Sequence, residues 1–344
     1  MTNEEIRKVQ VTGKSTYIVS LPKAWVNEMR IKPGDSVVVK KQEDSTLLIS
    51  PMGIKKPEKL GEVKVKINPQ ENPNTIVRKV VSLYLVGYNV IRLVSTGDRI
   101  APSQRDLIKD FVRKKLIGTE ITADSLNELT LQVLLSYPEL PIRNALRRMF
   151  LISSSMQKDA IVALEKFDQD LARDVIQMDD EVDRFSMYII RQLKSAVGDP
   201  RLIREIGLET ARDCLGYRLI SKSVERIADH SVLIAKKVLQ LKRHAEPLFL
   251  KKVNAMSSFA NSLFENAIDS LFKMDYKMAE EVIEKVAMIE QLENEAIQSM
   301  LEKGNREDIA NLRLVIESLR RIAEYSGDIA EIVLNLTINR AIKE

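Results

Sequence analysis

Two pairs of acidic residues with the spacing Glu-x-x-x-Asp are the side chains of this sequence best suited to bind a cation. They are Glu225 with Asp229 and Glu324 with Asp328. Residues i and i+4 lie one turn apart on the same face of a helix, so each pair can direct its oxygens at one ion. Like charges this close repel one another unless a cation screens them. The spacing therefore predicts a metal site, although the same spacing is also common on solvated helix faces.

A third acidic segment offers partners for these pairs. Asp179 and Asp183, the ends of the run Asp-Asp-Glu-Val-Asp, have the same spacing of four residues. Two such helices packed antiparallel would form a cradle of oxygen ligands, as carboxylates do in helix bundles. Oxygen ligands without a cysteine favour Mg²⁺, Mn²⁺ or iron over a thiolate-bound zinc.

The acidic helices belong to an internal repeat. At an offset of 107 residues, six positions match six others: Ala160, Asp168, Ala172, Val175, Ile176 and Asp183 match Ala267, Asp275, Ala279, Val282, Ile283 and Glu290. The segment 224–230 aligns with the segment 323–329 at an offset of 99, so the connections between the helices differ in length. Repetition of the acidic pattern favours a binding role over a chance arrangement.

The elements that would position these acids are helices in the second half of the chain. From about Pro141 onward, Leu, Ile, Ala and Met recur every three or four residues, which predicts a helix bundle. Residues 62–136 instead follow the order β-α-β-α-β-β, which predicts a small sheet with helices on one face. We find no catalytic motif in residues 62–136 and expect them to form a structural or dimerising spacer.

The first fifty residues form a separate, basic segment. Two runs rich in β-branched residues, a short helix that begins near Pro22, and two more such runs predict the order β-β-α-β-β. Residues 1–60 hold eleven Lys and Arg against seven Asp and Glu, and this excess of four equals the net charge of the whole chain. Any contact with a polyanion is expected there. Because so short a segment buries little apolar surface alone, we also expect it to dimerise.

Three runs in this segment carry a family resemblance. They are Val9-Gln-Val-Thr-Gly13, Tyr17-Ile-Val-Ser-Leu-Pro-Lys-Ala-Trp25 and Ile31-Lys-Pro-Gly-Asp-Ser-Val37. Over roughly residues 4–50 the chain resembles the AbrB/SpoVT/MazE family of swapped-hairpin DNA-binding β-barrels. The family implies a homodimeric barrel that grips DNA with basic side chains near the first hairpin and the strand ends. By position, the side chains that would do so here are Arg7, Lys8, Lys14 and Lys23.

The helical half carries a second resemblance. Ser223-Val-Glu-Arg-Ile-Ala-Asp-His-Ser-Val-Leu-Ile-Ala235 and Asp179-Asp-Glu-Val-Asp183 resemble two signatures of the PhoU family, phosphate-uptake regulators made of two three-helix repeats. The resemblance covers about residues 145–340 and implies sites for iron, zinc, manganese or magnesium on the acidic faces. The ligands it implies are Asp179, Asp183, Glu225 and Asp229 in the first repeat and Glu290, Glu324 and Asp328 in the second.

The second repeat departs from the family pattern. Val286 and Ala287 stand where acids are expected, and Tyr325 replaces the arginine of the signature. By position, Glu293 compensates in part. We therefore expect the second site to bind a metal weakly or to stay empty.

Together these patterns predict a multidomain α+β chain with a small swapped-hairpin barrel, an α/β unit and an all-α bundle. The expected domains are a DNA-binding β module, an α/β linker domain and two PhoU-like repeats, over 4–52, 62–136, 141–240 and 247–342. The single Cys214 excludes an internal disulfide and fits a reducing compartment. The apolar runs are too short to span a membrane, and no signal peptide is visible. We therefore expect a cytoplasmic protein that is not embedded in a membrane.

The favoured function is transcriptional regulation of phosphate uptake, with DNA and at least one further copy of the chain as partners. In this interpretation the barrel binds DNA and the helical domain responds to a metal ion, with or without phosphate. The alternative is a regulator that does not bind DNA, in which the barrel only dimerises and the bundle acts on phosphate transporter components. A phosphohydrolase, or any other enzyme, is disfavoured because the sequence has no histidine cluster, glycine-rich phosphate loop or nucleophile–base pair.

Overall fold

The computed structural model of the chain has the expected multidomain α+β architecture. The residues that it describes are 5–13, 15–41, 45–52, 61–303 and 308–342. The chain divides into two compact units, residues 1–58 and 59–344. Among the described residues, no helix is both long and apolar enough to cross a membrane.

The N-terminal unit consists of two hairpins and a short helix, and the predicted order β-β-α-β-β is confirmed. Its elements are β1 (Gln10–Thr12), β2 (Thr16–Ile18), α1 (Lys23–Glu28), β3 (Val37–Lys41) and β4 (Leu47–Pro51). β1 pairs with β2 and β3 pairs with β4, both antiparallel, as two separate sheets. The helix starts directly after Pro22, because proline needs no helical partner for its nitrogen there.

No described residue of this unit is buried. Apolar side chains on both hairpins face solvent, with exposed fractions of 61% for Val11, 74% for Tyr17, 54% for Val39 and 64% for Leu47. A two-stranded hairpin by itself is marginally stable in water. A single copy of this unit therefore lacks the apolar burial that a stable fold requires.

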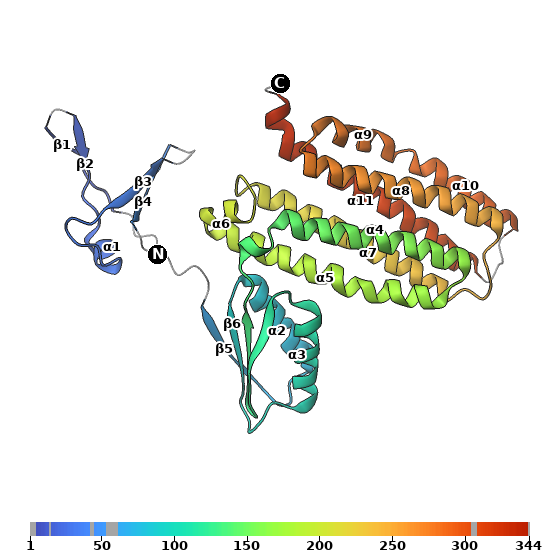
Figure 1. Ribbon diagram of the computed structural model, residues 1–344, viewed down its shortest axis with the longest axis horizontal. Coiled ribbons are helices and arrows are strands. Elements are labelled where there is room, and N and C mark those ends of the chain that lie inside the picture. Colours follow the sequence, from blue (N-terminus) through green and yellow to red (C-terminus); the bar gives the residue numbers. More distant parts are fainter. Residues whose placement is uncertain (1–4, 14, 42–44, 53–60, 304–307, 343–344) are drawn as a thin grey trace. The chain divides into compact units, whose positions relative to one another are not determined.

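The second unit begins with the predicted β-α-β-α-β-β segment. Its elements are β5 (Glu62–Ile67), α2 (Pro73–Val86), β6 (Val90–Ser95), α3 (Pro102–Lys115), β7 (Thr119–Asp124) and β8 (Glu128–Val133). The strand order is β5-β6-β8-β7, in which β5 and β6 are parallel and the other neighbours are antiparallel. α2 and α3 cover one face of this sheet (Figure 1), and they bury Ile76, Val80 and Ile108 against Ile91 and Leu93 of the sheet.

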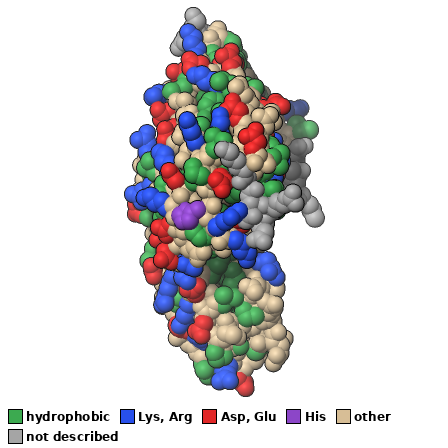
Figure 2. Space-filling view, turned by 90° about the vertical axis from the view of Figure 1, so that its right-hand side faces the viewer, with side chains coloured by type: hydrophobic (Ala, Val, Ile, Leu, Met, Phe, Trp, Pro, Cys, Tyr) green, Lys and Arg blue, Asp and Glu red, His purple; other side chains and the backbone are tan. Residues whose placement is uncertain are grey.

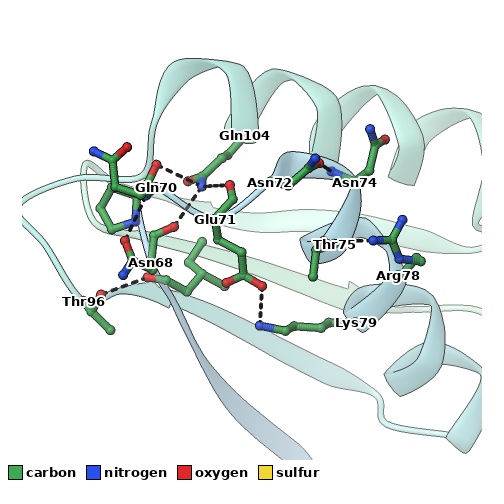
Figure 3. A network of polar contacts seen from close by, with 12 residues as sticks. Asn68, Gln70, Glu71, Asn72, Asn74, Thr75, Arg78, Lys79, Thr96 and Gln104 are labelled. Carbon is green, nitrogen blue, oxygen red and sulfur yellow. Dashed lines mark hydrogen bonds and ion pairs between the residues drawn. The ribbon is translucent and has the colours of Figure 1, made fainter.

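The loop that follows β5 is fastened by a buried glutamine of α3. The side-chain amide of Gln104 donates three hydrogen bonds to main-chain carbonyl oxygens of this loop (Figure 3). The acceptors belong to Asn68, Pro69 and Glu71, at 2.9, 3.2 and 2.8 Å. Asn72 then caps the amino end of α2. These contacts satisfy partly buried backbone carbonyl groups, so the network has a structural role.

The remainder of the second unit is a helix bundle around one apolar core. A short 3₁₀ turn (Tyr137–Glu139) precedes it. The first repeat contains α4 (Ile142–Lys166), α5 (Gln169–Gly198), the short α6 (Pro200–Glu205) and α7 (Asp213–Val238). The second contains α8 (Pro247–Lys273), α9 (Tyr276–Val286), α10 (Ile289–Lys303) and α11 (Ile309–Ala341).

The repeat offset of 107 residues is visible in the backbone. Phe167 and Met274, which are 107 residues apart, both end a helix in the left-handed conformation with φ 53°. The residues that follow them, Asp168 and Asp275, both cap the next helix by accepting hydrogen bonds from its first turn. Equivalent residues therefore perform the same local task in both repeats.

Equivalent residues of the two repeats also contact each other. The hydroxyl of Ser154 donates to the side-chain oxygen of Asn261, its equivalent at offset 107, at 3.0 Å. The guanidinium of Arg226 lies 5.3 Å from the ring centroid of Tyr325, its equivalent at offset 99. Such contacts between equivalents are typical of a twofold arrangement. The guanidinium of Arg226 thus lies over the ring face of Tyr325, which attracts it. An arginine at position 325 would instead repel Arg226.

The repeats differ in their second helix. α5 is continuous, whereas its counterpart breaks after Val286 into α9 and α10. Gly327 of α11 approaches this break closely, because a Cβ atom added there would lie 3.1 Å from a methyl group of Val286. Val286 therefore places methyl groups against α11 at the position where the family resemblance calls for an acid.

The α/β segment is fastened to α5 by Arg191, whose side chain is buried. Its guanidinium donates to the carbonyl oxygens of Tyr84 and, at 3.1 Å, Gly87, and to the side-chain oxygen of Asn89 at 2.9 Å. It also lies 4.8 Å from the ring centroid of Tyr84. These carbonyl groups end α2, so the negative end of the helix dipole and the aromatic face compensate the buried charge.

Candidate metal centre in the first repeat

The structure brings the first set of predicted ligands together on two packed helices. Asp179 and Asp183 lie one turn apart on α5, and Glu225 and Asp229 lie one turn apart on α7. The charges of Asp183 and Asp229 both act on Asp179, so the two helices present their acids to one another. Helix periodicity places each pair, and the packing of α5 on α7 joins the two pairs.

Asp179 is the acid of this cluster whose charge is least well compensated by its surroundings. Burial, and then the charges of Asp183 and Asp229, raise the pKa of Asp179 to about 6. Its Oδ1 atom is buried and accepts no hydrogen bond from any described residue. A buried oxygen without a donor is unfavourable, and a metal ion is a partner that would satisfy it.

The acids of α7 are more open. Asp229 keeps contact with solvent, and burial of the rest of its side chain, followed by the charge of Glu225, raises its pKa. Glu225 pairs with Lys222 on its own helix at 2.8 Å. The α7 side of the cluster therefore offers oxygens that an incoming ion can reach.

A lysine of the α/β segment also enters this cluster, which the sequence pattern did not predict. The Nζ atom of Lys115, the last residue of α3, lies 2.5 Å from an oxygen of Asp180 and 2.7 Å from one of Asp183. Its side chain is only 17% exposed. Burial acts to lower the pKa of Lys115, but the hydrogen bonds to the two acids outweigh it, and the pKa is raised. Lys115 is therefore a fixed positive charge at the edge of the cluster.

The four carboxylates of this cluster are suited to bind a hard cation. Carboxylate oxygens suit Mg²⁺, Mn²⁺ or iron, and the oxygen of Asp179 without a donor fits such a ligand. Among the residues that the structure describes, no three His, Cys, Asp or Glu side chains are already closed around one point. The acids thus form an open cluster, whose side chains must turn toward an ion to coordinate it.

The second set of predicted ligands has different neighbours. Glu324 forms ion pairs with Arg320 and, at 2.9 Å, with Arg321. Glu293, expected to compensate for the lost acids, is buried and pairs with Arg313 at 2.9 Å and with Arg320 at 3.4 Å. Guanidinium groups of the same repeat already compensate these two acids.

The other two members of the second set do not join this network. Glu290 is exposed on α10, and Asp328 is exposed on α11. Partial burial, and then the charges of Glu331 and Glu324, raise the pKa of Asp328, while Arg226 opposes this shift. The second set therefore differs from the first in that Glu324 is already paired with arginines.

The basic residues predicted to contact DNA lie on the surface of the N-terminal unit. Arg7, Lys8 and Lys23 are exposed, and Arg7 forms an ion pair with Glu5. Lys14 lies outside the described residues. Figure 2 shows lysine and arginine side chains interspersed with aspartate and glutamate over the face that it presents, as expected for a chain whose charges balance outside residues 1–60.

The fold and the acidic cluster define a class of protein: a helical bundle of two repeats about a pseudo-twofold axis, with acids on paired helices. Comparison with known families agrees. The PhoU domain matches residues 146–238 and 253–333, which are more than half of the chain. The chain belongs to the PhoU family. Residues 10–59 match a second family, described as antidote-toxin recognition MazE, bacterial antitoxin, so both resemblances seen in the sequence are confirmed.

Curated relatives cover the helical part. The phosphate-specific transport system accessory protein PhoU homolog of Borreliella burgdorferi is 24% identical over 54% of this chain and 86% of its own length. PhoU homolog 1 of Thermotoga maritima is 25% identical over 58% of this chain and 86% of its own length. The crystal structure of PhoU from Pseudomonas aeruginosa aligns with a TM-score of 0.50 and 22% identity, over 58% of this chain and 96% of that one. This structural likeness supports the bundle fold.

Proposed function

We propose that this protein is a transcriptional regulator of phosphate uptake, in which the N-terminal unit binds DNA and the bundle responds to a metal ion. One observation carries this proposal: the chain joins a PhoU bundle to a MazE-like segment. Residues 1–60, which include that segment, hold the whole positive net charge of the chain. Relatives of the bundle are named phosphate-specific transport system accessory proteins. In the proposal the protein is cytoplasmic and not an enzyme.

The proposed DNA-binding form is a homodimer or a higher oligomer. Both hairpins of the N-terminal unit leave apolar side chains in solvent. Met29, Ile31 and Met52 also line an open hollow of about 620 Å³. A second copy of the same unit can cover these surfaces, because its apolar residues are equally exposed. Arg7, Lys8 and Lys23 then contribute twice to one basic surface, which favours a polyanion.

The proposed signal is binding of a metal ion at the first repeat. Asp179, Asp183, Glu225 and Asp229 would hold it, and oxygen chemistry favours Mg²⁺, Mn²⁺ or iron, with zinc a further candidate. When bound, the metal would supply a local positive charge to which phosphate is attracted. In the second repeat, Glu290, Glu324 and Asp328 would form at most a weak site, since arginines already pair with Glu324.

The names of the relatives favour a second candidate function. They describe accessory proteins of a phosphate transport system. In this alternative the N-terminal unit only dimerises, and the bundle regulates phosphate transporter components by direct contact. The two functions differ in one property, which is affinity of the N-terminal unit for DNA.

The test is a gel-shift titration of the full-length protein with promoter DNA of phosphate-transport genes, at several salt concentrations. One variant carries R7A, K8A and K23A. A matched control carries K158A, K273A and K285A, which removes equal charge from exposed sites of the bundle. DNA affinity should fall steeply with salt in the parent, because phosphate contacts release counterions. It should drop about tenfold or more in the first variant and stay unchanged in the control.

Two outcomes would contradict the DNA-binding proposal. If the parent does not bind promoter DNA in low salt, the alternative function stands. If both variants lose affinity equally, general charge rather than the N-terminal unit is responsible. Sedimentation of the full-length protein checks the oligomer, and a monomer at micromolar concentration would contradict the dimeric form.

A further inference from the structure

Lys115 is the point at which the α/β segment contacts the acidic cluster of the bundle. The last turn of α3 carries three basic residues, Arg113, Lys114 and Lys115. Lys114 pairs with Asp110 on its own helix at 2.9 Å. Lys115 instead reaches α5 and pairs there with two acids. Of these neighbouring lysines, only Lys115 forms an ion pair that joins the two parts of the unit.

The acids that Lys115 contacts are those a metal would require. Its Nζ atom lies 2.7 Å from Asp183, one of the proposed ligands, and 2.5 Å from Asp180 beside Asp179. A metal ion held by Asp179 and Asp183 would stand within a few ångströms of this ammonium group. Two positive charges at such a distance repel strongly in a partly buried site. The lysine and the metal therefore compete for the same negative charge.

We propose that Lys115 is a built-in competitor of the metal, and that metal binding displaces it from Asp183 and loosens the polar attachment of the carboxyl end of α3 to α5. The inference rests on the proposed metal site. It gives the acids a cationic partner, because Lys115 offsets part of the repulsion among them. It also gives metal binding a structural consequence outside the bundle.

The second attachment of the α/β segment determines what that consequence is. Arg191, eight residues further along α5 than Asp183, holds the carboxyl end of α2 and contacts no acid of the cluster. Release of Lys115 therefore removes one polar attachment, while Arg191 and the apolar contacts of Ile117 with the bundle core and of Met187 with the α/β core stay in place. The last turn of α3 gains freedom relative to α5, and β5, the first strand of the segment, is the element that follows the N-terminal unit in the chain. Metal binding thus acts on the segment that joins the bundle to the part of the chain proposed to bind DNA.

The first test is a calorimetric titration of chelator-treated, full-length protein with Mn²⁺. Removal of the competitor in K115M, or in K115Q as a second variant, should tighten Mn²⁺ binding by about tenfold. K114M is the matched control, since its lysine is adjacent but pairs with Asp110 rather than with a proposed ligand; Asp180 acts on it only weakly, so its affinity should stay within about twofold of the parent. Equal affinity in the parent, K115M and K115Q would overturn the inference while the metal site stands.

The second test is hydrogen exchange of the last turn of α3, with and without Mn²⁺. In the parent and K114M, Mn²⁺ should speed exchange there, while in K115M exchange should already be fast and should not respond. Unchanged exchange in the parent at saturating Mn²⁺ would overturn the release of α3. If neither the parent nor K115M binds Mn²⁺, the proposed metal site fails, and the role of Lys115 fails with it.

Discussion

The two repeats place acids on equivalent helices but surround them with different partners. In the first repeat, Asp179 has a buried oxygen without a hydrogen-bond donor, and the lysine whose charge acts on it comes from another part of the chain. In the second, Glu293 and Glu324 pair with arginines of their own repeat. The order of the helices is shared apart from the break after Val286, so the neighbouring side chains decide whether an acidic face needs an external cation.

This difference separates a responsive cluster from a fixed one. A buried carboxylate paired with arginine is satisfied in every state of the protein, and its role is structural. A cluster that keeps an excess of negative charge changes its energy when a cation arrives. The α/β segment also contacts the responsive repeat, through Lys115 and Arg191 on α5. The first repeat is therefore the one that can transmit binding to the rest of the chain.

The largest expected effect concerns the attachment of the α/β segment to the first repeat. R191M removes the side-chain donor of the carbonyl oxygens of Tyr84 and Gly87; that of Tyr84 still accepts from the amide of Gly87, whereas that of Gly87 stays buried without the guanidinium. We expect the free energy of unfolding to fall by about 3 kcal/mol. R173M, which removes an exposed arginine of the same helix, should change it by less than about 0.5 kcal/mol. Urea unfolding measures both, and equal effects would show that Arg191 is not an anchor.

A smaller effect tests whether the second cluster is structural. E293Q removes the charge that pairs with Arg313 and Arg320. Because Glu293 is buried and its arginines are partly exposed, we expect a loss of stability of about 2 kcal/mol. E290Q, at an exposed position of the same helix, should be neutral within about 0.5 kcal/mol. A neutral E293Q would remove the distinction between a fixed and a responsive cluster.

The smallest effect is a pH dependence confined to the first cluster. In metal-free protein, the folded-state pKa of Asp179 is about 6, above the value near 4 of an unfolded aspartate. The folded state therefore binds more protons between these values, and stability falls as the pH rises from about 4 to about 6. Allowing for screening by solvent, the loss is on the order of 1 kcal/mol.

The matching measurement is urea unfolding in chelator at several pH values. The side chain at position 179 cannot ionise in D179N. The variant should therefore lose less stability than the parent between about pH 4 and about pH 6, and it should be more stable than the parent at pH 7. E324Q should keep the slope of the parent. An identical slope in D179N and the parent would mean that Asp179 ionises without cost in the folded protein.

Local patterns in the sequence predicted most of the fold. The hairpins, the β-α-β-α-β-β segment, the bundle and the repeat follow from periodicity, turn residues and equivalent positions such as Asp168 and Asp275. The family resemblances added the expected ligands. The replacement of an acid by Val286 also indicated an unequal second repeat, and the structure shows Val286 packed against Gly327.

The rest depended on contacts between distant residues. Lys115 is an ordinary basic residue at the end of a helix, and nothing in its neighbourhood indicates that it reaches Asp183, 68 residues away. Arg191 lies in an amphipathic helix, and only its packing against α2 reveals that it is buried. Likewise, the arginines of α11 are visible in the sequence, but their pairing with Glu293 of α10 is a tertiary property.

The most direct test of the central claim is the number of metal ions bound per chain, measured by Mn²⁺ titration with elemental analysis of the dialysed protein. The unequal repeats predict one ion per chain. D179N combined with D229N should lose it, with affinity reduced about a hundredfold or more, whereas E324Q combined with D328N should retain it. Two ions per chain, or loss of binding in the second variant rather than the first, would contradict the account.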